Sequence, residues 1–169
     1  MTGPRVVLVG PPGAGKSTVG SALAHRLGVP FLDTDTLIVE RAGKSVAEIF
    51  VEDGEPAFRS MEAAAVVDAL AMDGAVVALG GGAVSNPDTR VALAPRPVVL
   101  LDVDASEAAK RVGVTGARPL LLGDVRARMV TLMRERAPWY AEVASVTVRT
   151  TGRPVGEVVA EIEAWLTDA

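Results

Sequence analysis

A glycine-rich segment near the N-terminus carries residue types that bind phosphate groups. Gly10 to Ser17 reads G-P-P-G-A-G-K-S, which satisfies the pattern G-x-x-x-x-G-K-[ST]. Glycines let the backbone direct its N–H groups around phosphate oxygens, and the helix that follows adds the positive end of its dipole. In this pattern the lysine reaches the β and γ phosphates and the hydroxyl holds Mg²⁺. Lys16 and Ser17 are therefore the expected ligands of a nucleotide site; a glycine-rich turn without a ligand is the alternative.

Two carboxylates lie further along the chain, in the segment FLDTDTL. Asp33 and Asp35 are two residues apart, so on an extended chain their side chains point to the same face. In phosphoryl transfer one carboxylate can support the hydration shell of Mg²⁺ while another accepts a proton from, or orients, the acceptor hydroxyl. The spacing predicts a pair with two separate tasks, and the alternative is that Asp35 only caps the next helix.

Three consecutive glycines follow an apolar run in VVALGGGAV. Gly80, Gly81 and Gly82 lose much conformational entropy on folding, so a compensating use is expected. One interpretation is that the backbone approaches a ligand here and offers its amide groups. The other is a loose loop after a strand.

These segments must be positioned by the elements around them, and short β-branched runs alternate with longer stretches of helical period. The expected strands are Arg5–Val9, Phe31–Asp33, Ala75–Leu79, Val98–Asp102 and Val146–Arg149. The expected helices are Lys16–Leu27, Asp35–Arg41, Val46–Glu52, Glu55–Met72, a short one near Asp88–Leu93, Ala105–Val112, Asp124–Tyr140 and Val155–Thr167. This alternation predicts an α/β fold in which helices cover both faces of a parallel sheet and ligands bind at the carboxyl ends of the strands.

The composition limits the class of protein. The chain of 169 residues falls within the range of a single domain, and it contains no cysteine. No stretch approaches the ~20 apolar residues of a membrane helix, and no signal peptide is expected. The net charge is −4 and the basic residues are scattered, which argues against nucleic acid as a partner. We therefore expect one cytoplasmic, monomeric domain that binds neither membrane nor nucleic acid.

Taken together, the motifs resemble those of the shikimate kinase family. G-x-x-x-x-G-K-S-T, D-T-D, F-R with Glu62 three residues on, G-G-G, R-P-L-L and R-E-R-A-P-W-Y occur in that family's order and approximate spacing, over nearly the whole chain. The resemblance implies a three-layer P-loop NTPase fold with a five-stranded parallel sheet, similar to nucleoside monophosphate kinases. Its parts would be a core with the P-loop at 10–18, a substrate-binding helical region at about 34–62 and a mobile lid at about 113–124.

The resemblance also implies an activity and roles for single residues. The enzyme would transfer the γ-phosphate of ATP to the 3-hydroxyl of shikimate in aromatic amino-acid biosynthesis. The implied catalytic residues are Lys16, Asp35 as the candidate base, and Arg118 as the lid arginine. The implied ATP-binding residues are Gly13, Ala14, Gly15, Lys16, Ser17, Thr18, Arg111, Arg118 and Arg153. The implied shikimate-binding residues are Asp35, Arg59, Gly81, Gly82 and Arg136. Mg²⁺ would be bound by Ser17 directly and by Asp33 through water.

Two other functions stay open. The first is a small kinase of the same architecture that acts on gluconate or a nucleoside monophosphate. The second is a catalytically idle module that binds nucleotide as a regulator, which the intact P-loop and aspartates argue against. Arg59 and Arg136 favour a small carboxylate as the acceptor, because a guanidinium binds a carboxylate with two parallel hydrogen bonds.

Three further side chains have less defined roles. Phe50 and Phe58 either wall the pocket or belong to the core. His25, the only histidine, is expected at the surface or at a helix end.

Overall fold

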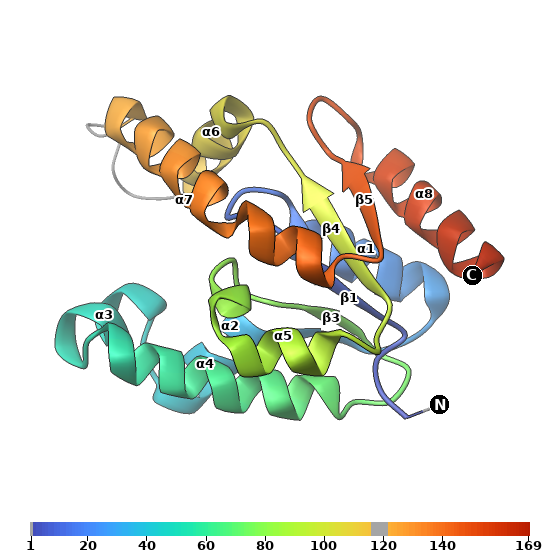
Figure 1. Cartoon of the computed structure of the whole chain (residues 1–169), viewed down its shortest axis with the longest axis horizontal. Helices are drawn as coiled ribbons and strands as arrows, with labels where there is room; N and C mark the ends of the chain where they lie inside the picture. Colours follow the sequence, from blue (N-terminus) through green and yellow to red (C-terminus); the bar gives the residue numbers. More distant parts are fainter. Residues whose placement is uncertain (1, 116–121) are drawn as a thin grey trace.

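The computed structural model describes residues 2–115 and 122–169, which form a sheet with helices on both faces (Figure 1). Five strands, all parallel, follow the order β2-β3-β1-β4-β5. The strands are β1 (Val6–Val9), β2 (Phe31–Asp33), β3 (Val76–Ala78), β4 (Val98–Asp102) and β5 (Val146–Arg149). The predicted α/β fold with a five-stranded parallel sheet is confirmed.

The central strand β1 is buried along its whole length, as expected for a parallel sheet covered on both faces. Its register brings the polar segments to one edge: Asp33 pairs with Ala78, and Ala78 pairs with Leu8. Strands β1, β2 and β3 therefore end side by side. Three segments therefore meet at this edge of the sheet: the glycine-rich loop, the two aspartates and the glycine run.

Each expected helix is present, with some differences at the ends. The helices are α1 (Lys16–Leu27), α2 (Thr34–Ala42), α3 (Val46–Glu52), α4 (Glu55–Leu70), α5 (Pro87–Leu93), α6 (Ala105–Thr115), α7 (Leu122–Val143) and α8 (Val155–Asp168). A short 3-10 helix, η1 (Ala83–Ser85), follows the glycine run and was not expected. Helix α2 begins at Thr34 because the Asp33 side chain accepts hydrogen bonds from the first turn and acts as the N-cap.

Three apolar clusters hold these layers together. One joins α1 and α8 to the sheet through side chains such as Leu23 and Ile162, and a second joins α4, α5 and α7 to the opposite face through Val66 and Leu93. A third, smaller cluster around Ile49 links α2, α3 and α4 away from the sheet. The helical region predicted at about 34–62 therefore packs partly on a core of its own.

The two phenylalanines differ in burial. Phe58 is 4% exposed and belongs to the third cluster, whereas Phe50 is 37% exposed. Their ring centroids lie 4.8 Å apart. Of the two interpretations, the core is right for Phe58, and His25 is exposed as expected.

Within residues 2–115 and 122–169, no helix combines the length and the apolar character that a membrane span requires.

Candidate active site

The glycine-rich segment turns sharply between β1 and α1. Gly10, Gly13 and Gly15 have φ angles of +154°, +80° and +94°, a region that favours glycine. A Cβ atom at Gly13 would lie 2.6 Å from the carbonyl oxygen of Ala108, so the loop packs directly against α6. Gly15 is the N-cap of α1 and supplies no side-chain cap, which leaves the positive end of this helix suited to an anion.

Lys16 lies back along this loop. Its Nζ donates to the carbonyl oxygens of Gly10 at 2.7 Å and Pro11 at 3.0 Å. Desolvation lowers the pKa of the ammonium from 10.5 to about 8, although the charges of Asp35 and Asp33 oppose this shift. An anion placed beside Lys16 would favour its charged form.

Asp33 uses its two carboxylate oxygens for different contacts. Oδ1 accepts hydrogen bonds from the N–H groups of Asp35 at 2.9 Å and Thr36 at 3.3 Å. Oδ2 accepts a hydrogen bond from the Ser17 hydroxyl. Asp33, rather than Asp35, is therefore the helix cap, and the interpretation of Asp35 as a cap is wrong.

The expected geometry of the aspartate pair also needs correction. Asp33 ends β2, but Asp35 lies in the first turn of α2, so the two do not share one extended segment. They nevertheless line the same cavity, together with Lys16. Burial and the charge of Asp33 raise the pKa of Asp35, while Lys16 and Arg59 oppose the rise.

Arg59 on α4 is held beside the glycine run. Its Nη1 donates to Glu62 Oε1 at 2.7 Å, its Nε lies 3.6 Å from Glu55 Oε1, and its guanidinium lies 5.4 Å from the centre of the Phe58 ring. Glu62 is only 4% exposed, and its burial raises its pKa while Arg59 opposes the rise. A Cβ atom at Gly82 would lie 2.6 Å from Nη1, so a side chain at position 82 would displace the guanidinium.

The other glycines of the run touch the remaining parts of the site. A Cβ atom at Gly80 would lie 2.6 Å from Asp35 Oδ1, and one at Gly81 would lie 2.8 Å from Pro12 in the P-loop. The run therefore contacts the P-loop at Gly81, Asp35 at Gly80 and Arg59 at Gly82. A loose loop does not make three such contacts, and the interpretation as a close backbone approach is favoured.

Two buried hydroxyl groups hold the run in place, and sequence reasoning missed both. Thr34 Oγ1 accepts from the Gly80 N–H at 3.0 Å, and the Tyr140 hydroxyl donates to the Gly81 carbonyl at 2.6 Å. Burial raises the pKa of Tyr140 to about 12, so it remains a donor. Arg136 lies one helical turn before Tyr140 on α7, half-buried, and its charge acts on Tyr140, Glu62 and Lys16.

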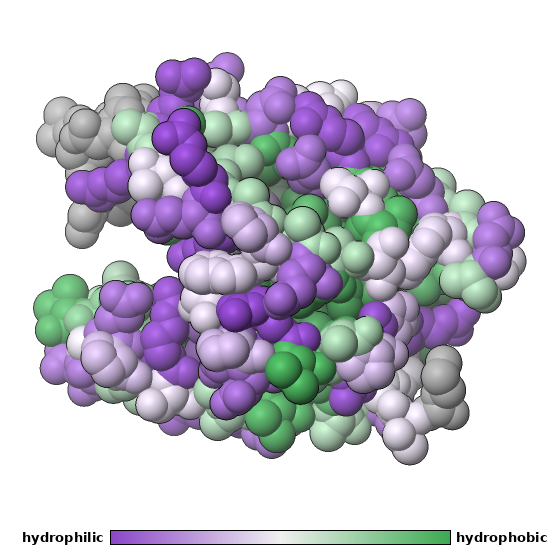
Figure 2. Space-filling view, in the orientation of Figure 1, coloured by the Kyte–Doolittle hydropathy of each residue, from purple (hydrophilic) through white to green (hydrophobic). Residues whose placement is uncertain are grey.

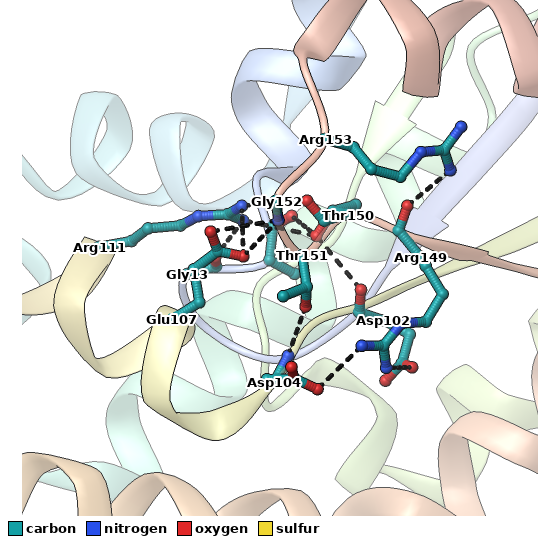
Figure 3. A network of polar contacts seen from close by, with 11 residues as sticks. Gly13, Asp102, Asp104, Glu107, Arg111, Arg149, Thr150, Thr151, Gly152 and Arg153 are labelled. Atoms are coloured by element: carbon teal, nitrogen blue, oxygen red, sulfur yellow. Dashed lines mark hydrogen bonds and ion pairs between the residues drawn. The ribbon is translucent and has the colours of Figure 1, made fainter.

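A polar network ties the P-loop to α6 and to the end of β5 (Figure 3). Arg111 Nη1 donates to the carbonyl of Gly13 at 2.9 Å, and Nη2 donates to the carbonyl of Thr150 at 3.3 Å. Glu107 Oε2 lies 3.1 Å from Arg111 Nη2 and accepts from the Gly152 N–H at 3.1 Å. The edge of the Arg111 guanidinium is thus bound by protein groups.

Arg153 extends along the outer side of the same segment. Its Nη1 donates to the Arg149 carbonyl at 2.8 Å and lies 3.0 Å from Glu161 Oε1. Arg153 and Arg111 both line a cavity of about 190 Å³ beside the P-loop, together with Ala14, Gly15, Thr18, Val19, Thr150, Val155 and Val158. The two predicted base-binding arginines therefore meet at one hollow.

The main cavity, of about 710 Å³, lies at the carboxyl edge of the sheet. It is lined by Pro12, Gly13, Gly15, Lys16, Ser17, Thr18, Asp33, Asp35, Leu79, Gly81, Glu107, Lys110, Arg111 and Val112. Figure 2 shows the surface hollowed on this side, between the lobe of α3 and α4 and the lobe of α6 and α7. Arg118, the predicted lid arginine, lies outside the described residues.

Comparisons with known proteins find one family over most of the chain. A family model described as shikimate kinase matches residues 12–167. The chain is 59% identical over 148 residues to a shikimate kinase of Thermobifida fusca, covering 88% of this chain and 86% of that protein. It is 46% identical over 166 residues to a shikimate kinase of Rhodococcus jostii, covering 98% of this chain and 99% of that protein.

A solved structure is similar over the same extent. It is described as shikimate kinase from Acinetobacter baumannii in complex with shikimate. The TM-score is 0.91 at 32% sequence identity, and the match covers 99% of this chain and 94% of that one.

Proposed function

The chain belongs to the shikimate kinase family, and from this premise we propose how its residues share the reaction. A shikimate kinase is an ATP-dependent phosphotransferase that moves the γ-phosphate of ATP to the 3-hydroxyl of shikimate. The observation that carries the assignment of residues is the position of Asp35. Its carboxylate lies within the electrostatic reach of both Lys16, on the donor side, and Arg59, on the acceptor side.

The donor half is the P-loop and its surroundings. The triphosphate would lie against the loop of Gly13, Ala14 and Gly15 and the first turn of α1, where Ser17 and Thr18 follow Lys16. Lys16 would then leave its two carbonyl partners for the β and γ phosphates, whose negative charge favours the ammonium form. Neutralising charge that develops on the phosphoryl oxygens is the main task of such groups.

Ser17 and Asp33 fit a Mg²⁺ ion bound with the nucleotide. Among the described residues, no three His, Asp or Glu side chains gather to hold a metal by themselves. Mg²⁺ commonly takes one or two protein oxygens and completes its shell with phosphates and water. Ser17 would bind the ion directly while its hydroxyl hydrogen stays directed at Asp33, and Asp33 would act through water. The ion, when bound, would neutralise charge on the phosphates.

The acceptor half is built on Asp35, Arg59 and the glycine run. Asp35 would accept the proton of the 3-hydroxyl as its oxygen attacks the γ-phosphorus, and a raised pKa brings the carboxylate closer to the range suited to a general base. The carboxylate of shikimate would be bound by Arg59 and Arg136 and by the amides of Gly81 and Gly82. Glu62 would keep Arg59 in place through its 2.7 Å contact.

Arg111 and Arg153 would bind the adenine. The donor atoms of Arg111 are directed at Gly13 and Thr150, which fixes the guanidinium beside the P-loop, and a guanidinium can stack its flat face on a base. The 190 Å³ cavity between the two arginines supports this assignment. Arg118 is assigned to the transferring phosphoryl group from the family resemblance alone.

The remaining assignments are proposals of the same kind. The chain would act as one kinase domain, with the P-loop core, the helical acceptor region at about 34–62 and a lid at about 113–124. We also propose a cytoplasmic monomer with ATP and shikimate as its only substrates.

An acceptor panel tests the function. With Mg²⁺ and ATP, ADP should be released rapidly only when shikimate is added. Comparable release with AMP, CMP or gluconate, and none with shikimate, would favour the related-kinase alternative. ATP binding without release of ADP for any acceptor would favour the idle module.

A further inference from the structure

The glycine run, Gly80 to Gly82, has two backbone N–H groups without a described partner, because each of its peptide groups is held by one other contact. The Leu79–Gly80 peptide is held by Thr34, which accepts from the Gly80 N–H at 3.0 Å. The next peptide is held within the run, because the Gly80 carbonyl accepts from the N–H of Ala83 at 3.0 Å. The Gly81–Gly82 peptide is held by Tyr140, whose hydroxyl donates to the Gly81 carbonyl at 2.6 Å.

The contacts decide where the free donors point. In a trans peptide the C=O and the N–H of one unit point in opposite directions, and every described peptide bond is trans. The Gly82 N–H is therefore directed away from the Tyr140 hydroxyl, and the Gly81 N–H away from Ala83. Within the described part of the chain, neither N–H has a hydrogen-bond partner.

The two hydroxyls reach the run from elements far apart in sequence. Thr34 lies between the two aspartates at the start of α2 and is fully buried. Tyr140 is 4% exposed and lies on α7 one turn after Arg136. Each hydroxyl thus joins the run to an element that also carries a proposed shikimate ligand, Asp35 or Arg136.

We propose that Thr34 and Tyr140 are positioning residues for shikimate, which orient the Gly81 and Gly82 amides relative to Asp35, Arg59 and Arg136. The inference rests on the proposed function, because it assumes that these amides bind the acceptor. Neither side chain lines the main cavity. Thr34 therefore acts through the glycine backbone, and Tyr140 acts through it and through Arg136, whose guanidinium interacts with the Tyr140 hydroxyl. Without the hydroxyls, flexible glycines would sample orientations in which the amides point elsewhere, and part of the binding free energy would be lost in ordering them.

Removing one hydroxyl at a time tests the proposal. Tyr140→Phe and Thr34→Val keep most of the side-chain shape, and Thr34→Ser restores the hydroxyl. Calorimetric titration should show the Kd for shikimate rising about 3- to 10-fold in Tyr140→Phe and Thr34→Val, the scale of one neutral hydrogen bond. Thr34→Ser should bind shikimate within about 2-fold of the unaltered chain, and the Kd for ATP should stay within about 2-fold in all three.

Thr89→Val is the matched control. Thr89 is also a buried threonine, 5% exposed, but it lies on α5 and lines a separate cavity with Ala63 and Val66. Its substitution should leave the Kd for shikimate unchanged. If Thr34→Val fails to fold, Tyr140→Phe carries the test.

Three results would overturn the proposal. The first is a folded Tyr140→Phe variant that binds shikimate as the unaltered chain does. The second is an equal loss of affinity for ATP and shikimate, which would mark a general structural role. In the third, the unaltered chain binds no shikimate, and then the proposed function falls as well. The first two results leave that function standing.

Discussion

Replacing Arg59 by lysine tests the acceptor site, because the change keeps the charge and most of the length. Arg59 Nη1 is already engaged by Glu62 at 2.7 Å, and Glu62 is too buried to be left without a cation. Arginine can keep this contact and still offer its other N–H groups to a carboxylate, whereas the lysine ammonium is a point charge. The substituted side chain would have to divide its single ammonium between Glu62 and the ligand.

Arg59→Lys should cost shikimate binding the free energy of one charge-assisted hydrogen bond, about 1.5–3 kcal/mol. The KM for shikimate should then rise about 10- to 100-fold, provided that KM follows binding. Steady-state kinetics with each substrate varied in turn would measure this. The KM for ATP should change much less, because the P-loop uses separate groups.

Arg41→Lys is a suitable control, since Arg41 Nη2 donates to the exposed Asp68 at 2.7 Å on a neighbouring surface. Both of its KM values should stay near those of the unaltered chain. Two results would exclude Arg59 from the acceptor site: KM values for both substrates that stay unchanged in Arg59→Lys, or an equal rise in both KM values together with a lower Tm. In the first case Arg59 is a surface residue of α4, and in the second it serves folding.

Three further predictions concern the donor half. Because the pKa of Lys16 is about 8, about nine-tenths of the side chain should be charged at pH 7 and about one-tenth at pH 9. The Kd for ATP, measured by calorimetry, should therefore rise roughly tenfold between these two pH values. Lys16→Met should bind ATP more weakly and lose this pH dependence. Chelating Mg²⁺ should abolish ADP release and adding it back should restore the rate; full activity in chelator would exclude the proposed metal role of Ser17 and Asp33. Arg111→Ala should raise the KM for ATP about fivefold or more, on the scale of a lost stacking and charge contact, while Arg149→Ala, whose exposed guanidinium binds Asp102 and Asp104, should not.

The P-loop was predictable because its residues are contiguous and their chemistry depends on backbone turns that glycine permits. The same holds for the strands, since buried β-branched runs mark them directly. Even Glu62 carried a signal, because its spacing of three residues from Arg59 places both on one side of a helix.

The geometry of the two aspartates was predicted wrongly because either aspartate could cap the next helix. The segment D-T-D was interpreted as extended, but Asp33 caps α2, so the helix begins at the next residue and Asp35 turns with it. Which of two aspartates caps a helix depends on where the strand ends, and strand ends are set by pairing with neighbouring strands.

Contacts between segments that are distant in the sequence could not be predicted from it. Thr34 meets Gly80 across 46 positions, and Tyr140 meets Gly81 across 59. No sequence pattern identifies either hydroxyl as a contact of the glycine run. Each one binds a backbone group, and every residue carries backbone groups. The approach of Arg59 to Gly82 was implied only by the family resemblance, which assigns both residues to shikimate.

The most direct test of the central claim is the identity of the product. The purified chain should be incubated with Mg²⁺, ATP and shikimate, and the products followed by phosphorus NMR and mass spectrometry. We expect shikimate phosphorylated on its 3-hydroxyl, because Asp35 is proposed to take the proton of that hydroxyl, and ADP in equal amount, because each ATP gives up one phosphoryl group. Phosphate on a different hydroxyl, or ADP and inorganic phosphate without phosphorylated shikimate, would contradict it.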